Sequence, residues 1–386
     1  MNFCILNFKM KTYKIYLKVF SFVSLILLLI VFFINYNVDP ENIYKSYLEI
    51  NKSKKTLSNT YIDKLVVSKK GLFFRNDLLN EREIKLSLVK KEIAAECAVL
   101  GSSPALQVSS FREIKSFTST CSSLVNLAIS AAVLEDYLVF SHHLSLSNSP
   151  PSKIIIFVYP YTLNLNRDAQ WLRYEDDFNK IKDKILINKK NYREKIPRKN
   201  YNNLLFENLF NMRYFLESLK TFFSNNNPSI QEVKEIDYIN GMKKNVLLPD
   251  GSLVYSSEIM SSKLMRKIDG VSGIQNYKIK ENNWYSPYAI NIFDKLIKFL
   301  SQKFEVILVM SPYHPSVFDF PEQKVVKAIN IIEPIIIDIA KKNNVSLYGS
   351  FNSKKIPCSK SDYFDAVHAR SSCFKKIENL WIIKKK

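Results

Sequence analysis

The hydrophobic pattern of the chain begins with one long apolar run. Residues 19–38, VFSFVSLILLLIVFFINYNV, contain no charged side chain, and no acidic residue precedes Asp39. As an α-helix, a stretch of this length rises roughly 30 Å, enough to cross the hydrocarbon core of a bilayer. Lysines occur before it at positions 9, 11, 14 and 18. The pattern predicts a basic cytoplasmic tail at 1–18 and a transmembrane anchor at 19–38, so the membrane is the first expected partner.

A cleaved signal peptide is the alternative interpretation of this run. Its apolar region is usually shorter and ends in small residues at the cleavage site, whereas here the bulky FFINYNVDP follows. We therefore expect an uncleaved anchor and a single-pass protein. Because the lysines lie on the N-terminal flank, everything after Asp39 is expected outside the cytoplasm, in the periplasm or at the cell surface.

Short apolar runs alternate with helical patterns in the rest of the chain. Strands are predicted at 96–101, 123–130, 153–160, 304–312 and 344–350, and helices at 132–144, 288–302 and 322–342. Strands that are apolar on both faces are typical of a parallel sheet covered on both sides, so the expected fold class is α/β. A polar, partly helical lead at 39–92 precedes this domain at 93–386. The segment at about 165–285 breaks the alternation and is predicted to be a mostly helical insertion or cap.

The charge balance is strongly basic, with a formal net charge of +20 at pH 7. Only 10 of the 56 basic residues are arginine, and lysine is mixed with asparagine and isoleucine throughout. Recognition of bases and phosphates favours arginine and a compact basic surface, so nucleic acid is not an expected partner. A solvated basic surface explains the charge, and attraction to anionic polymers or headgroups is secondary.

Four cysteines lie in the predicted exported part: Cys97, Cys121, Cys358 and Cys373. An even number in an oxidising compartment indicates disulfide bonds, with buried thiols as the alternative. Cys358 and Cys373 bracket a short segment and are expected to pair, and Cys97 is a candidate partner for Cys121. No C-x-x-C or Cys/His cluster has the spacing of a metal site, so neither a metal nor another cofactor is expected.

Polar chemistry follows several predicted strands, at the end of the sheet where α/β proteins place their sites. GSS (101–103) follows the first strand, YPYTLN (159–164) the third and SPYHP (311–315) the fourth. Near the C-terminus, YFDAVHA contains Asp365 and His368 in a D-x-x-H spacing. A serine at a strand-to-helix turn acts as a nucleophile when a histidine takes its proton and a carboxylate orients that histidine.

These blocks resemble those of the SGNH/GDSL hydrolase superfamily. LGSSPA is similar to the first block and FDAVH to the terminal D-x-x-H block, which implies that Ser103 is the nucleophile and that Asp365 and His368 complete the triad. The resemblance implies a three-layer, flavodoxin-like fold around a parallel sheet. Together with the anchor and the VDP after it, the blocks are similar to membrane-anchored SGNH-like proteins of acyl transfer to or from cell-surface polysaccharide. The implied partners are that polysaccharide and a membrane-bound acyl donor.

The middle blocks depart from the family pattern. In NLAISAA, which resembles the second block, Ala131 stands where the family has a glycine whose N–H joins the oxyanion hole. The third block, usually Gly-x-Asn-Asp, leaves only Asn164. Asn126 is a further candidate for contact with the oxyanion, and His314 is a candidate for binding substrate or for competing with His368 as the base. Each also has a structural interpretation: a strand-edge hydrogen bond for Asn126, a turn for Asn164 and packing between prolines for His314.

Two hypotheses follow from the sequence. The first is an anchored, extracytoplasmic serine esterase or O-acyltransferase that uses Ser103, His368 and Asp365. The second is a catalytically silent scaffold of the same fold that binds a polymer or a partner in an export or modification complex. Ala131 and the missing Gly-x-Asn-Asp favour the second hypothesis, and the intact triad residues favour the first. Even Ser103 has a structural interpretation, as the N-cap of a helix that Pro104 opens.

Overall fold

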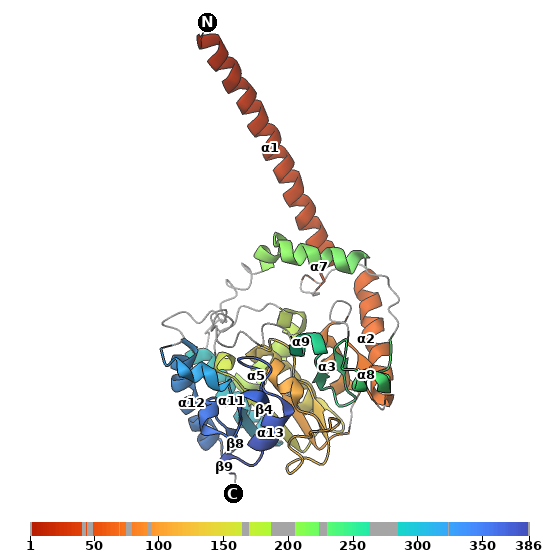
Figure 1. Cartoon of the computed structure of the whole chain (residues 1–386), viewed down its shortest axis with the longest axis vertical. Coiled ribbons are helices and arrows are strands. Elements are labelled where there is room, and N and C mark those ends of the chain that lie inside the picture. The colour runs from red at the N-terminus through yellow and green to blue at the C-terminus, as the bar shows by residue number, and fades with distance from the viewer. Residues whose placement is uncertain are drawn as a thin grey trace. The chain divides into compact units, whose positions relative to one another are not determined.

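The computed structural model divides the chain into two compact units (Figure 1). The first contains residues 1–54 and 195–227, and the second contains 55–194 and 228–386. The predicted insertion at about 165–285 is therefore shared between them. The structure describes residues 2–40, 44, 49–68, 70–74, 79–91, 94–163, 170–186, 205–223, 230–261, 285–322 and 324–384.

The second unit is built on a six-stranded sheet with the order β3-β2-β4-β7-β8-β9. Its strands are β2 (Cys97–Leu100), β3 (Leu124–Asn126), β4 (Lys153–Val158), β7 (Glu305–Met310), β8 (Ser346–Gly349) and β9 (Trp381–Ile383). The first five in the chain are parallel, and only β9 pairs antiparallel, with β8. Counted along the chain, the parallel strands lie in the order 2-1-3-4-5 of a doubly wound α/β sheet. The predicted parallel α/β sheet is confirmed.

Both faces of this sheet are covered, because almost every residue of the parallel strands is buried. On one face Phe157 of β4 and Tyr348 of β8 lie in the same row, and the ring of Phe117 contacts both. Phe374 packs edge-on against Phe157. The longer helices of this unit are α3 (Glu81–Lys90), α4 (Leu134–Leu146), α5 (Glu175–Leu186), α11 (Pro287–Ser301), α12 (Lys324–Lys342) and α13 (Ser371–Ile377). The three predicted helices correspond to α4, α11 and α12.

A second, three-stranded antiparallel sheet was not predicted. It contains β1 (Leu72–Phe73), β5 (Val246–Leu247) and β6 (Leu253–Val254), in the order β1-β5-β6. Short helices α8 (Glu235–Ile239) and α9 (Ser257–Ser261) flank β5 and β6. The insertion is thus not purely helical, and strands of two residues are too short to show an alternating pattern. The turn between β5 and β6 needs glycine, because a Cβ on Gly251 (φ +83°) would lie 2.4 Å from the Asn126 carbonyl oxygen.

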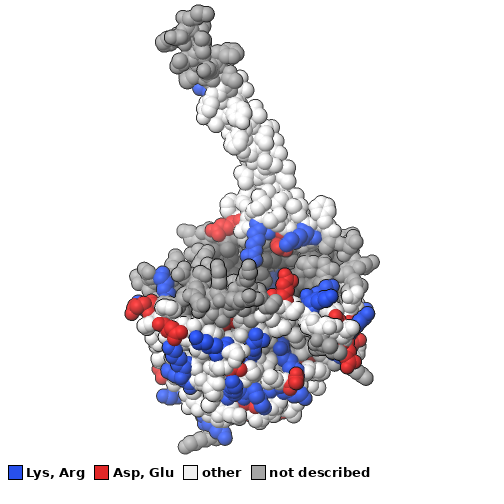
Figure 2. Space-filling model, viewed as in Figure 1, with Lys and Arg blue, Asp and Glu red and all other residues white. Residues whose placement is uncertain are grey.

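The first unit contains α1 (Asn2–Val38) and α7 (Met212–Phe223). Within α1, Tyr13–Val38 is, among the described residues, the one helical segment with the length and composition to cross a membrane. On the face shown in Figure 2 this segment is white along most of its length, with basic colour only near its N-terminal end, where Lys14 and Lys18 lie in the sequence. It is a candidate membrane span or signal anchor. The helix α2 (Glu49–Val67), most of which belongs to the second unit, accounts with α3 for the predicted helices of the polar lead.

Candidate active site

The turn that carries Ser103 lies at the carboxyl end of β2. This strand is the first of the six-stranded sheet along the chain and pairs with both β3 and β4, so its end is the topological switch point of the sheet. A Cβ on Gly101 would lie 2.6 Å from the Cβ of Ala105 and 2.9 Å from that of Phe157, so only glycine fits at this position of the turn. The short helix η1 (Ser103–Gln107) then begins at Ser103 itself.

The capping interpretation of Ser103 is wrong. Ser102 holds the N-cap position of η1, and no side chain makes a capping hydrogen bond there. The first residue of a helix has an N–H without an intrahelical acceptor, and Ser103 is that residue. Helix capping therefore explains neither the hydroxyl of Ser103 nor its position at the start of η1.

Ser103, His368 and Asp365 form a continuous hydrogen-bonded chain. The Ser103 Oγ lies 2.8 Å from Nε2 of His368, although 265 positions separate the two residues in the sequence. Nδ1 of the same ring lies 2.7 Å from Oδ2 of Asp365. The three side chains predicted to act together are brought together, and all three residues are partly exposed to solvent.

The protonation of this chain follows from the surroundings of Asp365. Burial favours its protonated form, but His368 and the backbone N–H groups of Val367 and His368 donate to the carboxylate and outweigh burial, so the pKa of Asp365 lies below its ordinary value. Because the carboxylate is ionised at neutral pH, the neutral imidazole carries its proton on Nδ1. Nε2 is then the acceptor for the Ser103 hydroxyl, as a general base requires.

The loop that presents Asp365 and His368 is closed on itself. The Phe364 N–H donates to the His368 carbonyl over 2.8 Å, and Tyr363 and Ala369 form an isolated antiparallel bridge. A disulfide joins Cys358 and Cys373 on either side of the loop. The pairing predicted from the sequence is therefore present, and it holds the ends of the segment that carries two of the three triad residues.

A second disulfide joins Cys97, the first residue of β2, to Cys121. The two come together because β2 and β3 are parallel neighbours, with Cys97 level with Leu124, and Cys121 lies three residues before that position. This bond fixes the amino end of β2, the strand whose carboxyl end leads into Ser103. Burial of Cys97 in the sheet does not prevent the pairing.

Ala131, at the position where the SGNH pattern has a glycine, adopts a left-handed backbone conformation with φ at +53°. Side chains hold the N–H groups on either side of it: Glu81 accepts from Ser130 over 2.9 Å, and Ser102 accepts from Ala132 over 3.2 Å. The Ala131 N–H itself donates no hydrogen bond to another described residue. A strained, exposed turn tied directly to Ser102 is typical of a functional constraint.

Asn126 has a structural role in place of a contact with substrate. Its amide group is buried and donates to the carbonyls of Ala105 and Val108, over 2.8 and 2.7 Å. Its Oδ1 accepts from the Ala128 N–H over 2.9 Å. Both amide hydrogens are therefore used to fix η1 to the end of β3, and neither is left for an oxyanion.

His314 is also outside the triad. Its Nδ1 accepts from the Ser316 N–H over 3.1 Å, which caps η6 (Pro315–Asp319), and its ring packs edge-on against Tyr363. Burial and the nearby charge of Lys360 lower the pKa of His314. Its backbone N–H donates to the Ala366 carbonyl, so the backbone of His314 is bonded to the D-x-x-H loop. Asn164, the remaining candidate, lies outside the described residues.

Tyr255 lies beside the triad and was not predicted. Its hydroxyl donates to the Ser103 carbonyl over 3.4 Å, and its ring lies 6.2 Å from that of His368 and 5.8 Å from that of Phe364. Burial raises its pKa well above the ordinary value, so the phenol stays protonated. Tyr255 follows β6 in the irregular insertion, where no sequence motif marks it.

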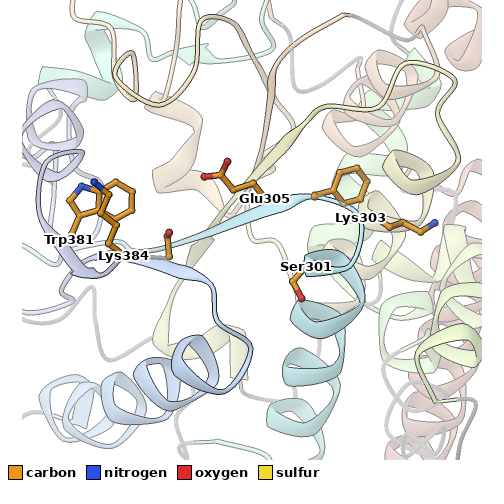
Figure 3. A pocket seen from close by; sticks show the side chains of 7 residues that line it. Ser301, Lys303, Glu305, Trp381 and Lys384 are labelled. Carbon is orange, nitrogen blue, oxygen red and sulfur yellow. The ribbon is translucent and has the colours of Figure 1, made fainter. Parts of the chain in front are cut away.

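The open hollow of about 460 Å³ in Figure 3 is separate from this site. Glu305 and Ser346, the first residues of β7 and β8, contribute to its wall, with Trp381 and Lys384 side by side. It therefore lies at the amino ends of the strands, opposite the edge that carries Ser103. No group of three or more His, Cys, Asp or Glu side chains in the described part of the chain could hold a metal ion.

Comparisons with family models, with curated proteins and with solved structures gave no significant match. The site is defined by its own geometry: a serine, a histidine and an aspartate lie in hydrogen-bonded series at the carboxyl ends of the strands of an α/β sheet.

Proposed function

We propose that this protein is a membrane-anchored serine esterase or O-acyltransferase of the SGNH type that acts on acylated cell-surface polysaccharide. The observation that carries the proposal is the Ser103–His368–Asp365 series, with donor–acceptor distances of 2.8 and 2.7 Å. The resemblance of LGSSPA and FDAVH to the SGNH blocks supports the reaction class, and the anchor followed by these blocks supports the polysaccharide substrate.

In the proposed reaction His368 Nε2 takes the proton of Ser103 as Oγ attacks the ester carbonyl. Asp365 stabilises the imidazolium that forms and keeps the ring in position. The negative charge on the former carbonyl oxygen is met by the N–H groups of Ser103 and Ala131. His368 then returns the proton to the leaving alcohol, and an acyl-serine remains. Water or a sugar hydroxyl attacks this ester in the second half, with His368 again as base.

The positive φ of Ala131 supports the assignment of its N–H to the oxyanion. Alanine pays roughly 1–2 kcal/mol for a left-handed conformation, so the conformation persists only because the surrounding contacts impose it. Glu81 and Ser102 supply those contacts by holding the neighbouring N–H groups. The replacement of glycine by alanine therefore preserves the donor that the reaction needs.

The triad is tested by hydrolysis of an aryl acetate with the full chain in detergent micelles. Ser103→Ala and His368→Ala should each abolish turnover, and the double variant should lose little more, because nucleophile and base act as a unit. Asp365→Asn should reduce the rate less, since the imidazole remains but is poorly oriented. His314→Ala is the matched control, because that histidine supports the loop without touching Ser103.

A folded Ser103→Ala variant with wild-type activity would exclude the proposed nucleophile. If His314→Ala were the inactive variant, the base would have to be reassigned. If the wild type neither hydrolyses esters nor reacts with a fluorophosphonate probe at Ser103, the silent scaffold replaces the enzyme as the proposed function.

The proposed topology places the N-terminus in the cytoplasm and the α/β unit outside. The four lysines before the apolar run and the absence of acidic residues there support this orientation. An alkaline phosphatase fused after Lys386, which folds only outside the cytoplasm, should be active. A full-length but inactive fusion would reverse the orientation.

A further inference from the structure

The helix α7 of the first unit buries polar side chains. Tyr214, Ser218 and Thr221 are its buried residues, and they recur at intervals of four and three positions, which places them on one face. The Ser218 hydroxyl lies 3.1 Å from Oδ1 of Asn35, and the Tyr214 hydroxyl donates to Asp39 over 2.7 Å. The inward face of α7 is therefore a polar face, bound to the C-terminal end of α1.

The outward face of the same helix is apolar. Met212, Leu216, Phe222 and Phe223 are 60%, 52%, 58% and 74% exposed. At 3.6 residues per turn these side chains, with the partly exposed Phe215 and Leu219, cover about a third of the circumference. A helix of a water-soluble protein has the reverse arrangement, with its apolar stripe toward the core. A continuous apolar face of this kind marks a surface that meets another apolar phase.

The position of α7 is fixed at the end of the candidate membrane span. The Asn35 side chain donates to the carbonyls of Asn208 and Leu209, in the segment that leads into the helix, over 3.2 and 3.0 Å. Asn35, which makes these bonds, lies within four residues of Val38, the last residue of α1. The helix is therefore attached where α1 leaves its apolar stretch.

Aromatic rings gather at the same level. The ring of Phe32 lies 5.6 Å from that of Phe210, and Tyr36 lies 6.0 Å from Tyr44, which contacts Tyr214 at 6.2 Å. Tyrosine and tryptophan are enriched where a span meets the headgroups, because their rings have one apolar and one polar end. This cluster and the polar anchoring of α7 both indicate the depth of the membrane–water interface.

We propose that α7 lies in the interface of the bilayer that α1 crosses, with its apolar face in the boundary between headgroups and acyl chains. The inference rests on the membrane anchor proposed above and is independent of the esterase. An amphipathic helix in the interface places apolar side chains 5–10 Å into this boundary and its charged residues in the headgroups. In α7 those charged residues are Arg213, Glu217 and Lys220, all at least partly exposed on the flank between the apolar and the buried face.

Lipid is favoured over a second protein as the partner of the apolar face of α7, because this face belongs to the unit that contains the candidate membrane span. The partner surface is then supplied by insertion of α1 itself and needs no separate binding event. The result is an anchor with two elements, one across the membrane and one along its surface.

The test uses the full chain in vesicles of phosphatidylcholine and phosphatidylglycerol. In a Cys4→Ser background the remaining four cysteines are disulfide-bonded, so one added cysteine takes an environment-sensitive NBD fluorophore. Leu216→Cys places the label on the apolar face, and the adjacent Glu217→Cys places it on the charged flank as the matched control. Leu27→Cys, within the span, reports insertion of the anchor.

The Leu216 label should emit at shorter wavelength and should lose more than half its intensity to lipids with a nitroxide near the top of the acyl chain. The Glu217 label should be quenched several-fold less. If the Leu27 label is quenched and the Leu216 label is water-like, the anchor stands and the interfacial helix is wrong. A blue-shifted Leu216 label that lipid nitroxides do not reach means that protein covers the face, and equal quenching at Leu216 and Glu217 means no oriented helix; both refute the proposal. Loss of quenching at Leu27 refutes the anchor and the helix together.

Discussion

Ser102→Ala tests the proposed role of the Ala131 turn in stabilising the oxyanion separately from the proposed nucleophile, Ser103. The Ser102 side chain is fully buried, and its Oγ accepts from the Ala132 N–H over 3.2 Å. This contact is a direct link between the turn after β2, which leads into Ser103, and the turn that carries Ala131. Removing the hydroxyl leaves the triad residues unchanged and leaves the buried Ala132 N–H without its acceptor.

The expected cost in stability follows from that lost acceptor. A buried donor left without a partner costs about 1–3 kcal/mol, and the free energy of unfolding should fall by this amount. Catalysis should also suffer, because the Ala131 N–H is displaced relative to the developing oxyanion. Complete removal of an oxyanion donor lowers kcat by about 10²–10³, and a displaced donor should lose about tenfold. KM should hardly change, since this interaction acts only in the transition state.

The assay is aryl acetate hydrolysis together with chemical denaturation of the same preparations. Ser123→Ala is the matched control, since the Ser123 hydroxyl also accepts a backbone N–H, that of Glu96, over 3.0 Å. That contact lies at the amino ends of β2 and β3, away from Ser103. It should reduce stability but leave kcat unchanged. A Ser102→Ala variant that is destabilised with wild-type kcat, or one that changes KM alone, would refute the proposed coupling between the two turns.

Two further predictions concern the surroundings of the site. Ala131→Gly should stabilise the protein by about 0.5–1 kcal/mol, because relief of the left-handed alanine outweighs the added freedom of the unfolded chain. Ala132→Gly is the control and should destabilise the protein. Equal losses of stability for the two variants in thermal unfolding would contradict this prediction. Burial lowers the pKa of Lys85 to about 8, against 10.5 when unfolded. The unfolded state then binds more protons between these values, so the free energy of unfolding should rise by about 2 kcal/mol from pH 8 to pH 10. Lys85→Met should remove this rise, and a variant that retains it would assign the pH dependence to another group.

The parallel sheet and the triad were predictable because their patterns are local. A buried parallel strand is apolar on both faces, so its run is visible in the sequence without knowledge of its neighbours. The GSS turn and the D-x-x-H spacing each lie within a few residues, and the order of the blocks along the chain suffices to relate them. The length of β3 was overestimated, because only Leu124–Asn126 pair with β2 before the chain turns.

Other parts of the site depend on contacts that no local pattern encodes. Tyr255 reaches Ser103 from an insertion with weak periodicity, through a hairpin whose strands have two residues each. Asn126 had the right residue type for an oxyanion donor, but which carbonyls its amide meets is decided by the tertiary fold. The left-handed Ala131 likewise lies between two N–H groups that bond to distant side chains, those of Glu81 and Ser102.

The two halves of the candidate site are each stabilised locally and joined by the sheet. The Cys97–Cys121 bond holds β2, the strand that leads into Ser103, and the Cys358–Cys373 bond holds the loop that carries Asp365 and His368. Neither bond crosses from one half to the other. In the described part of the chain, the hydrogen bonds between them include Ser103–His368 and one from the Ser371 hydroxyl at the start of α13 to the Gln107 carbonyl at the end of η1. Lys375 of α13 also donates to the Thr118 hydroxyl.

This division determines how each kind of damage should appear. Loss of a disulfide loosens one half while the strand order still brings the two halves together, so it acts first on stability. A displacement of η1 against α13 changes the distance between Ser103 Oγ and His368 Nε2 directly, and proton transfer depends steeply on that distance. The stability of the α/β unit and the alignment of its triad are therefore governed by different contacts, and a variant can lose the second while it keeps the first.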